Sequence, residues 1–212
     1  MHYRTDQHHG LKHNPFNAVV VPRPIGWISS IDGDGNVNLA PYSFFNGIAY
    51  TPPQVMFSST SRHEQHEGDH KDSLHNIERT KHFVVNMATW ELREAVNHSS
   101  IPAPHDVDEF ELTGLTKMPA TNSTVPMVAE CPIHLECVAT QFVELESPDR
   151  SRSTNTMVIG RVEVIHIRDD VIVDGMVDLR LVKPIGRLGY RDYAVVEDLF
   201  SMDRPTWPPS DR

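Results

Sequence analysis

Short apolar runs bounded by turn residues dominate the chain and predict a protein made mainly of strands. One run extends from Ile25 to Ile31 and is followed by Asp32-Gly33-Asp34-Gly35, whose two Asp-Gly pairs are a strong hairpin signal. The returning strand is expected to begin at Val37. Further strands are predicted at 18–21, 54–59, 83–87, 132–145, 156–167 and 171–173.

Helical spacing of apolar residues is limited to three short stretches. Ser73 is expected to be the N-cap of a helix that contains Leu74 and Ile77 and ends near Thr80. A second helix is predicted from Trp90 to Asn97, and a short one is expected around 107–112. No repeat and no βαβα alternation is visible, so a doubly wound parallel sheet is disfavoured. The pattern favours a closed antiparallel barrel with inserted helices.

Residues 1–212 are predicted to form one domain. Residues 1–13 are expected to be an extended, histidine-rich arm, and residues 204–212 an extended, proline-rich tail.

Pro41 interrupts the returning strand of the predicted hairpin. Proline has no amide hydrogen to donate to a strand ladder, so the segment Asn38-Leu39-Ala40-Pro41-Tyr42-Ser43 is not expected to be a regular strand. A local break of this kind indicates that some other group approaches the backbone there.

Composition and charge narrow the class of function. The formal charge of −10 argues against a nucleic-acid-binding protein, which would carry a basic surface. No apolar run has the length of a membrane helix, and the first residues lack the apolar core of a signal peptide. Cys131 and Cys137 are expected on one face of one strand, too far apart to form a disulfide, which favours a cytoplasmic protein with reduced thiols.

Three familiar kinds of site are disfavoured. His63, His66, His70 and His75 are irregularly spaced in and beside a polar loop, which is not typical of a metal site. The sequence around Ser29 is not the Gly-x-Ser-x-Gly elbow of a serine hydrolase, and no Gly-x-Gly-x-x-Gly motif follows a strand.

Several motifs together resemble the flavin reductase-like family, which has an FMN-binding split barrel. The long stretch from Pro22 to Asn46 carries most of the resemblance. It continues in order through Pro52-Pro53, Phe57-Ser58-Ser59, Lys71-Asp72-Ser73, Asn76-Ile77, Phe83-Val84-Val85-Asn86 and Arg187-Leu188-Gly189-Tyr190. Within the family, the chain most resembles flavoredoxins and the reductase component of nitrilotriacetate monooxygenase. The resemblance implies a mainly β, antiparallel, Greek-key split barrel with short inserted helices, FMN as cofactor, and a homodimer.

The flavin ring needs an apolar slot with a few hydrogen bonds. The resemblance places Asn38, Ala40, Pro41, Tyr42 and Ser43 against the ring, and Pro41 would leave neighbouring amides free to face it. Trp27 and Ser29, on the preceding strand, are further candidates, although Trp27 is equally compatible with a core position.

The FMN phosphate needs cations and amide donors. Lys71 and Ser73, at the start of a helix, suit this need, and Ser58 and Ser59 could add hydroxyl groups. Asp72 is included in the site, but it is expected to pair with Lys71 or Arg62 or to cap the helix. Arg187, with Tyr190, is expected to close the site from the far side, and Arg23 to reach the phosphate or a neighbouring subunit.

Two functional hypotheses follow from the resemblance. The first is an NAD(P)H-dependent flavin reductase, in which hydride passes from nicotinamide to flavin N5 and the reduced flavin supplies a monooxygenase. The second is a flavoredoxin-like FMN electron carrier that docks to a redox protein and does not oxidise nicotinamide; flavin binding for storage or sensing is a weaker third. No side chain is predicted to be catalytic, because the cofactor carries the chemistry.

Overall fold

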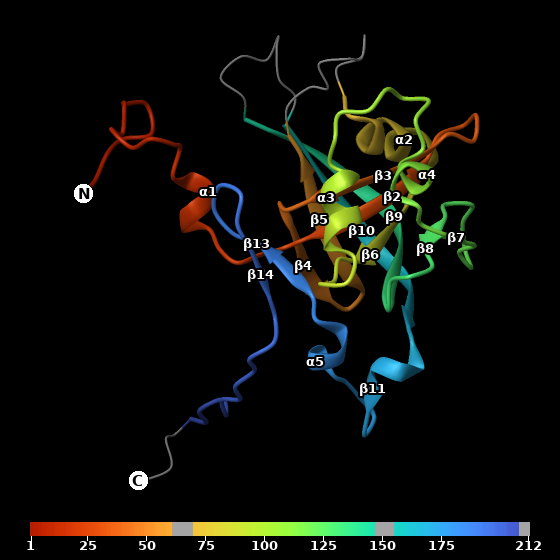
Figure 1. Ribbon diagram of the computed structural model, residues 1–212. Helices are drawn as coiled ribbons and strands as arrows, with labels where there is room; N and C mark the ends of the chain where they lie inside the picture. The colour runs from red at the N-terminus through yellow and green to blue at the C-terminus, as the bar shows by residue number, and fades with distance from the viewer. Residues whose placement is uncertain (61–69, 147–154, 208–212) are drawn as a thin grey trace.

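The computed structural model describes residues 1–60, 70–146 and 155–207 (Figure 1). Its largest element is an antiparallel sheet of seven strands in the order β3-β2-β6-β9-β10-β5-β4. The strands are β2 (Gly26–Ile31), β3 (Val37–Tyr42), β4 (Phe45–Tyr50), β5 (Pro53–Ser59), β6 (His82–Met87), β9 (Ile133–Leu145) and β10 (Asn155–Ile167). The predicted mainly β, antiparallel fold with short helices is confirmed.

Smaller elements surround this sheet. Three strands form a second sheet, namely β1 (Arg23–Pro24), β13 (Ile185–Arg187) and β14 (Tyr193–Val195). Two short ribbons pair β7 (Lys117–Met118) with β8 (Met127–Val128) and β11 (Ile172–Val173) with β12 (Met176–Val177). The helices are α1 (Phe16–Val19), α2 (Asp72–Thr80), α3 (Arg93–His98), α4 (Glu109–Thr113) and α5 (Leu179–Val182), with a 3₁₀ turn at Asp169–Val171.

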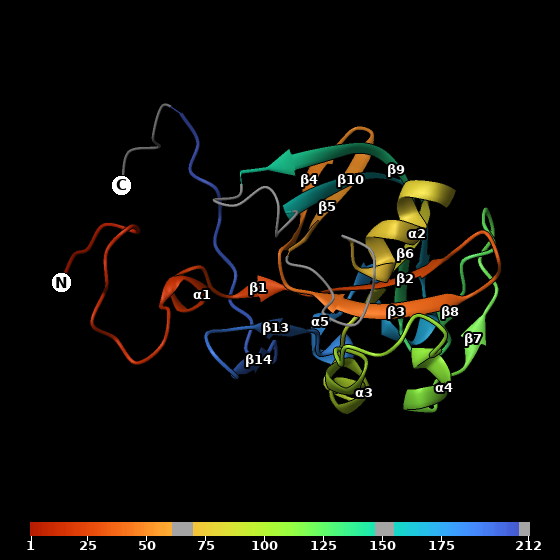
Figure 2. The same cartoon turned by 90° about the horizontal axis from the view of Figure 1, so that it is seen from above.

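The hairpin of β2 and β3 separates two hydrophobic cores. Ile28 and Tyr42 face the first core, which also contains Leu74 of α2 and Phe57 of β5. On the opposite face, Trp27 belongs to the second core, which includes residues of α3 and α4. Figure 2 shows α2 on one side of the hairpin and α3 and α4 on the other. Both faces of β2 are therefore buried, which explains its nearly continuous run of apolar and small residues.

Pro41 lies within β3 rather than ending it. It pairs with Trp27, and β3 is an edge strand of the sheet. The amide of Leu39 points away from β2, because it donates to Glu109. Backbone amides alternate in direction along a strand, so the hydrogen that Pro41 lacks would also point to the free edge. The expectation of an irregular strand was wrong, and the amides of Ala40 and Tyr42 point toward β2 instead of a ligand.

Several element boundaries also differ from the prediction. Residues 16–19 form the short helix α1, where part of a strand was expected. Helix α2 begins at Asp72 with Lys71 as its N-cap, so Ser73 lies inside the first turn. Helix α3 begins at Arg93 because Trp90 to Leu92 form turns.

The two cysteines do not share a face of one strand. Cys137 lies on β9 in the first core, whereas Cys131 precedes β9 and belongs to the second core. Both are buried and free, and burial raises the pKa of both thiols. They are structural apolar residues in the two cores.

Within the described ranges, no helix is long and apolar enough to cross a membrane. The N-terminal arm and the C-terminal segment extend to the same side of the molecule (Figure 2).

Candidate functional site

Four of the predicted site residues converge where β3, β5 and α2 meet. Asn38 donates from Nδ2 to Ser73 Oγ at 2.7 Å, and both side chains are buried. The hydroxyl of Tyr42 forms hydrogen bonds with Ser73 and Ser59. Burial raises the pKa of Tyr42 to about 12, so this hydroxyl stays protonated. The four side chains hold the end of β5 against the start of α2.

Lys71 provides a cation at this junction. Its Nζ lies 5.9 Å from the centre of the Tyr42 ring, and the residue is half-buried. Burial lowers the pKa of its ammonium group. No carboxylate in the described part of the chain forms an ion pair with Lys71. A half-buried cation beside the first-turn amides of a nine-residue helix is a suitable environment for an anion.

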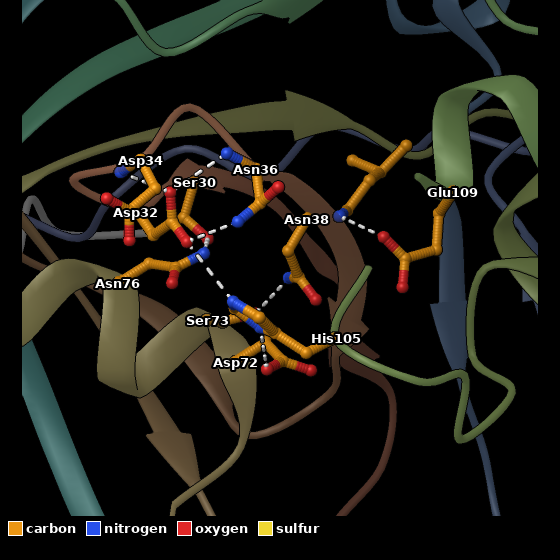
Figure 3. Close-up of polar contacts among 11 residues, drawn as sticks. Ser30, Asp32, Asp34, Asn36, Asn38, Asp72, Ser73, Asn76, His105 and Glu109 are labelled. Carbon is orange, nitrogen blue, oxygen red and sulfur yellow. Dashed lines mark hydrogen bonds and ion pairs between the residues drawn. The ribbon is translucent and has the colours of Figure 1, made fainter. Parts of the chain in front are cut away.

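Asp72 is bound by an imidazole that the sequence did not indicate (Figure 3). His105 Nδ1 lies 2.7 Å from Asp72 Oδ1, and His105 Nε2 lies 3.1 Å from Asp32 Oδ2. Asp32 also accepts from the amides of Asp34 and Asn36, each at 2.8 Å. The loop that carries His105 thus joins the β2–β3 turn to the start of α2. Of the two cations expected to pair with Asp72, Lys71 forms no ion pair with it, and Arg62 lies outside the described residues. The contact with His105 was not predicted.

The His105 contacts perturb the pKa values of the groups involved. Burial acts to lower the pKa of His105, but the hydrogen bonds and charges of Asp72 and Asp32 outweigh it and the pKa is raised. Burial acts to raise the pKa of Asp32, but hydrogen bonds from Asn36, Asp34 and His105 hold it well below its usual range. Both shifts favour the charged forms of the pair.

Glu109 is a second residue that sequence reasoning missed (Figure 3). Its Oε2 accepts the amide of Leu39 at 2.9 Å, on the free edge of β3. Burial raises the pKa of Glu109 to about 7; the hydrogen bond from Leu39 opposes that rise, and the charges of Asp72 and Asp108 add to it. Neither Glu109 nor His105 belongs to a motif, and only the fold brings them to this strand and helix.

Trp27 and Ser29 lie away from this junction, on the opposite face of β2 from Ile28, and Trp27 belongs to the second core. Both side chains have no exposed surface. Trp27 Nε1 donates to Ser99 Oγ at 2.9 Å, and Ser29 Oγ donates to the carbonyl of Pro126 at 2.6 Å. Their side chains are therefore satisfied within the protein, and the structure does not bring them to the surface where a ligand could bind.

A cavity of about 670 Å³, here called the first cavity, lies beside the segment that joins β3 to β4. Its apolar lining comes from Phe44, Phe45 and Met56, with Leu145, Phe16 and Val20 at other positions of the wall. Ser43, Ser58 and Thr60 add hydroxyl groups. A cavity of this volume, mostly apolar with a few polar groups, is typical of a small-molecule site.

A second cavity of about 380 Å³ lies on the other side of Arg23 and Ser43, which line both cavities. Pro41 and Arg187 line the second cavity, together with Tyr190. Arg187 lines only the second of these two cavities, and Ser58 lines only the first. Ala40 packs against the first core and lines neither of the two cavities.

The sequence disfavoured a metal site at His63, His66, His70 and His75, and the structure describes only the last two of these. His63 and His66 fall outside the described residues. Among those that are described, no group of three or more His, Cys, Asp or Glu side chains is arranged to hold a metal ion.

A comparison with models of known protein families identifies the family of this chain. The flavin reductase like domain matches residues 18–181. The chain belongs to this family. The antiparallel sheet is accordingly a flavin reductase-like split barrel, as the sequence resemblance implied.

Individual proteins are similar to this chain over most of their length. The uncharacterized protein BH2278 of Halalkalibacterium halodurans is 35% identical over 89% of this chain and 88% of its own. The structure of nitrilotriacetate monooxygenase component B from Bacillus cereus is similar, with a TM-score of 0.85 and 28% identity over 95% of this chain and 98% of that one. The structure of 2-nitrobenzoate 2-nitroreductase NbaA from Pseudomonas fluorescens has a TM-score of 0.77 and 30% identity, over 92% and 90% of the two chains.

Proposed function

We propose that this flavin reductase-like protein is an FMN-dependent oxidoreductase that holds FMN in the first cavity. The observation that carries the proposal is the chemistry of that cavity. Its volume of about 670 Å³ and its apolar side chains suit a flat ring system, and the hydroxyls of Ser43, Ser58 and Thr60 suit the polar edge of such a ring. Family membership supports a flavin as the occupant.

The residues at the start of α2 would serve the phosphate. Lys71 supplies a cation without an ion-pair partner among the described residues, and the first-turn amides and the dipole of α2 favour an anion at the same point. Ser73, Asn38 and Tyr42 would act indirectly, because their side chains bond to one another and fix the start of α2. Asp72 would also act indirectly, since it is held by His105.

FMN supplies the electron-transfer chemistry when it is bound. The chain's own groups would position the cofactor, exclude water from its apolar face and neutralise its phosphate. We further propose that NADH or NADPH is the electron donor and that the reduced flavin serves a monooxygenase. The name of the Bacillus cereus protein, component B of a monooxygenase, supports the second part.

The exposed edge strand β4 supports the proposal of a homodimer. Five of its six residues are exposed, and Tyr50 is 97% exposed. Phe45 and Asn46 at the start of β4 line the first cavity, so a second copy on this edge would also cover the cavity. A monomeric mass by light scattering would overturn this part of the proposal.

Lys71→Met tests the phosphate site. Loss of the cation is expected to weaken FMN binding about tenfold to a hundredfold, as measured by quenching of flavin fluorescence. Lys12→Met, which removes the same charge from the exposed arm, is the control and should leave the affinity unchanged. Equal affinities for wild type and Lys71→Met would contradict the assignment.

Nicotinamide oxidation tests the activity. Wild-type protein with FMN is expected to oxidise NADH or NADPH, and the rate should depend on the flavin concentration. Tight FMN binding with no oxidation of either nicotinamide would instead favour the electron carrier. Failure to bind FMN at all would contradict both functions.

A further inference from the structure

The second cavity contains an arrangement of charge that the proposed flavin site does not use. Arg23 and Arg187 lie directly opposite each other in the register of β1 and β13, and both line the cavity. Like charges at opposed positions on paired strands repel each other. The chain as a whole is acidic, with a formal charge of −10. The two arginines therefore form a local positive site on an acidic protein.

Arg23 is fixed in place by neutral groups. The side chain is buried, and its Nη1 donates to the carbonyls of Asn17 and Val20 at 2.6 and 2.7 Å. Its Nη2 donates to the carbonyl of Leu188 at 3.0 Å. Burial lowers the pKa of Arg23, and the charge of Arg187 lowers it further. Its Nε donates to Ser43 Oγ at 3.4 Å. Neutral oxygen atoms thus hold the guanidinium, which keeps its net positive charge.

Arg187 is held with one side toward the cavity. Its Nη2 donates to the carbonyl of Tyr190 at 2.5 Å, and its Cζ lies 4.5 Å from the centre of the Tyr193 ring. Neither Arg187 nor Arg23 has an ion-pair partner in the part of the chain that the structure describes. Two cations without a carboxylate partner in one cavity favour the binding of an anion.

The other residues that line the second cavity are suited to an aromatic anion. Asn14, Asn17 and Asn97 contribute amide groups, and Ser100 contributes a hydroxyl. Tyr190 and Tyr193 are 49% and 40% exposed and offer aromatic faces. Helix α1 packs closely against the 188–190 turn beside the cavity. Gly189 leaves no room for a side chain there, because a Cβ at this position would lie 2.6 Å from Cβ of Ala18.

We propose that the second cavity is an oxyanion-binding subsite, in which Arg187 and Arg23 bind the carboxylate or phosphate of an aromatic molecule that exchanges electrons with the flavin. The location of the subsite rests only on the two arginines and their cavity. Its role in electron exchange rests on the proposed function, since Ser43 and Arg23 form the wall shared with the first cavity.

Calorimetric titration tests the subsite without depending on flavin. The probes are benzoate, its neutral analogue benzamide and inorganic pyrophosphate. Binding of benzoate but not benzamide is expected if the natural ligand is an aromatic acid, and binding of pyrophosphate if it is a dinucleotide. Binding of either anion supports the subsite, whereas binding of neither by the wild type would overturn it.

Variants of Arg187 locate the binding. Arg187→Met is expected to weaken binding of the anion about tenfold, and Arg187→Lys to restore part of the affinity. Arg191→Met is the matched control, because Arg191 is exposed on the same turn and does not line the cavity. Unchanged anion binding in Arg187→Met would contradict the subsite.

Flavin binding separates the two proposals. FMN affinity is expected to be unchanged in Arg187→Met, because the residue does not line the first cavity. If Arg187→Met lost FMN and anion binding together, the second cavity would belong to the flavin site and the proposal of a separate subsite would fail. If the wild type bound the anion but not FMN, the subsite would stand and the proposed flavin function would fail.

Discussion

Glu109 and Pro41 show what single residues contribute along β3. Glu109 accepts the Leu39 amide on the free edge of the strand, and two residues later Pro41 needs no partner there. The sequence showed that Pro41 was unusual, but not on which edge its missing hydrogen would lie. That edge depends on strand order, which is a tertiary property. Lys71, Tyr42 and Ser43 could be singled out because the family motif fixes their local setting.

Glu109→Gln is predicted to increase stability at high pH. The pKa of Glu109 is about 7 in the folded protein and 4.5 in the absence of the fold, so the folded state binds more protons between these values. Stability from this group therefore falls as pH rises from about 4.5 to about 7. Glutamine can still accept the Leu39 amide but cannot ionise. Urea unfolding above pH 7 should show a gain on the order of 1–3 kcal/mol for the variant.

Glu111→Gln is the control for this pH effect, because Glu111 is exposed on the same helix. The gain for Glu109→Gln should vanish at a pH near 4.5, where the carboxyl is protonated in the folded state. An equal change in stability at low and high pH would show that Glu109 acts through packing rather than ionisation.

At the scale of elements, α2 is positioned by groups from three other segments. Asn38 of β3 and Ser30 of β2 bond to Ser73 and Asn76 of α2, and His105 reaches Asp72 from the loop before α4. The apolar pattern predicted the helix and its end at Thr80, because both depend on local sequence. It did not predict His105, which lies 33 residues from Asp72 in the chain. It also predicted a strand at 18–21, since apolar runs of this length do not distinguish a strand from a short helix.

His105→Gln is predicted to loosen the start of α2 in a pH-dependent way. The pKa of His105 is raised in the folded state, so its stabilising charge is fully present below the unfolded pKa near 6.5 and is lost as pH rises through the folded value. Hydrogen exchange at the first-turn amides of α2 should be faster in the variant at mildly acidic pH. The cost should be no more than about 1 kcal/mol, because the imidazole is partly exposed.

His75→Gln provides the matched control, since His75 is exposed on α2 itself. Its exchange rates should equal those of the wild type. The proposed role of His105 would be disproved if the first-turn amides of α2 exchanged at the wild-type rate in His105→Gln at mildly acidic pH. It would also be disproved if the substitution accelerated exchange equally well above the pKa of His105.

For the whole molecule, the family resemblance anticipated the split barrel, and the comparisons confirm it. The predicted site residues divide among a buried junction, two cavities and the second core. The motif from Pro22 to Asn46 crosses both faces of the β2–β3 hairpin. Neighbouring residues of one motif therefore face different environments, and linear proximity cannot separate ligand contacts from core packing.

The most direct test of FMN binding in the first cavity is a crystal structure of the protein grown with FMN. Flavin density is expected in the first cavity, in contact with Ser43 and Ser58, and phosphate density at Lys71 and the start of α2. Flavin density in the second cavity, beside Arg187, would contradict FMN binding in the first cavity.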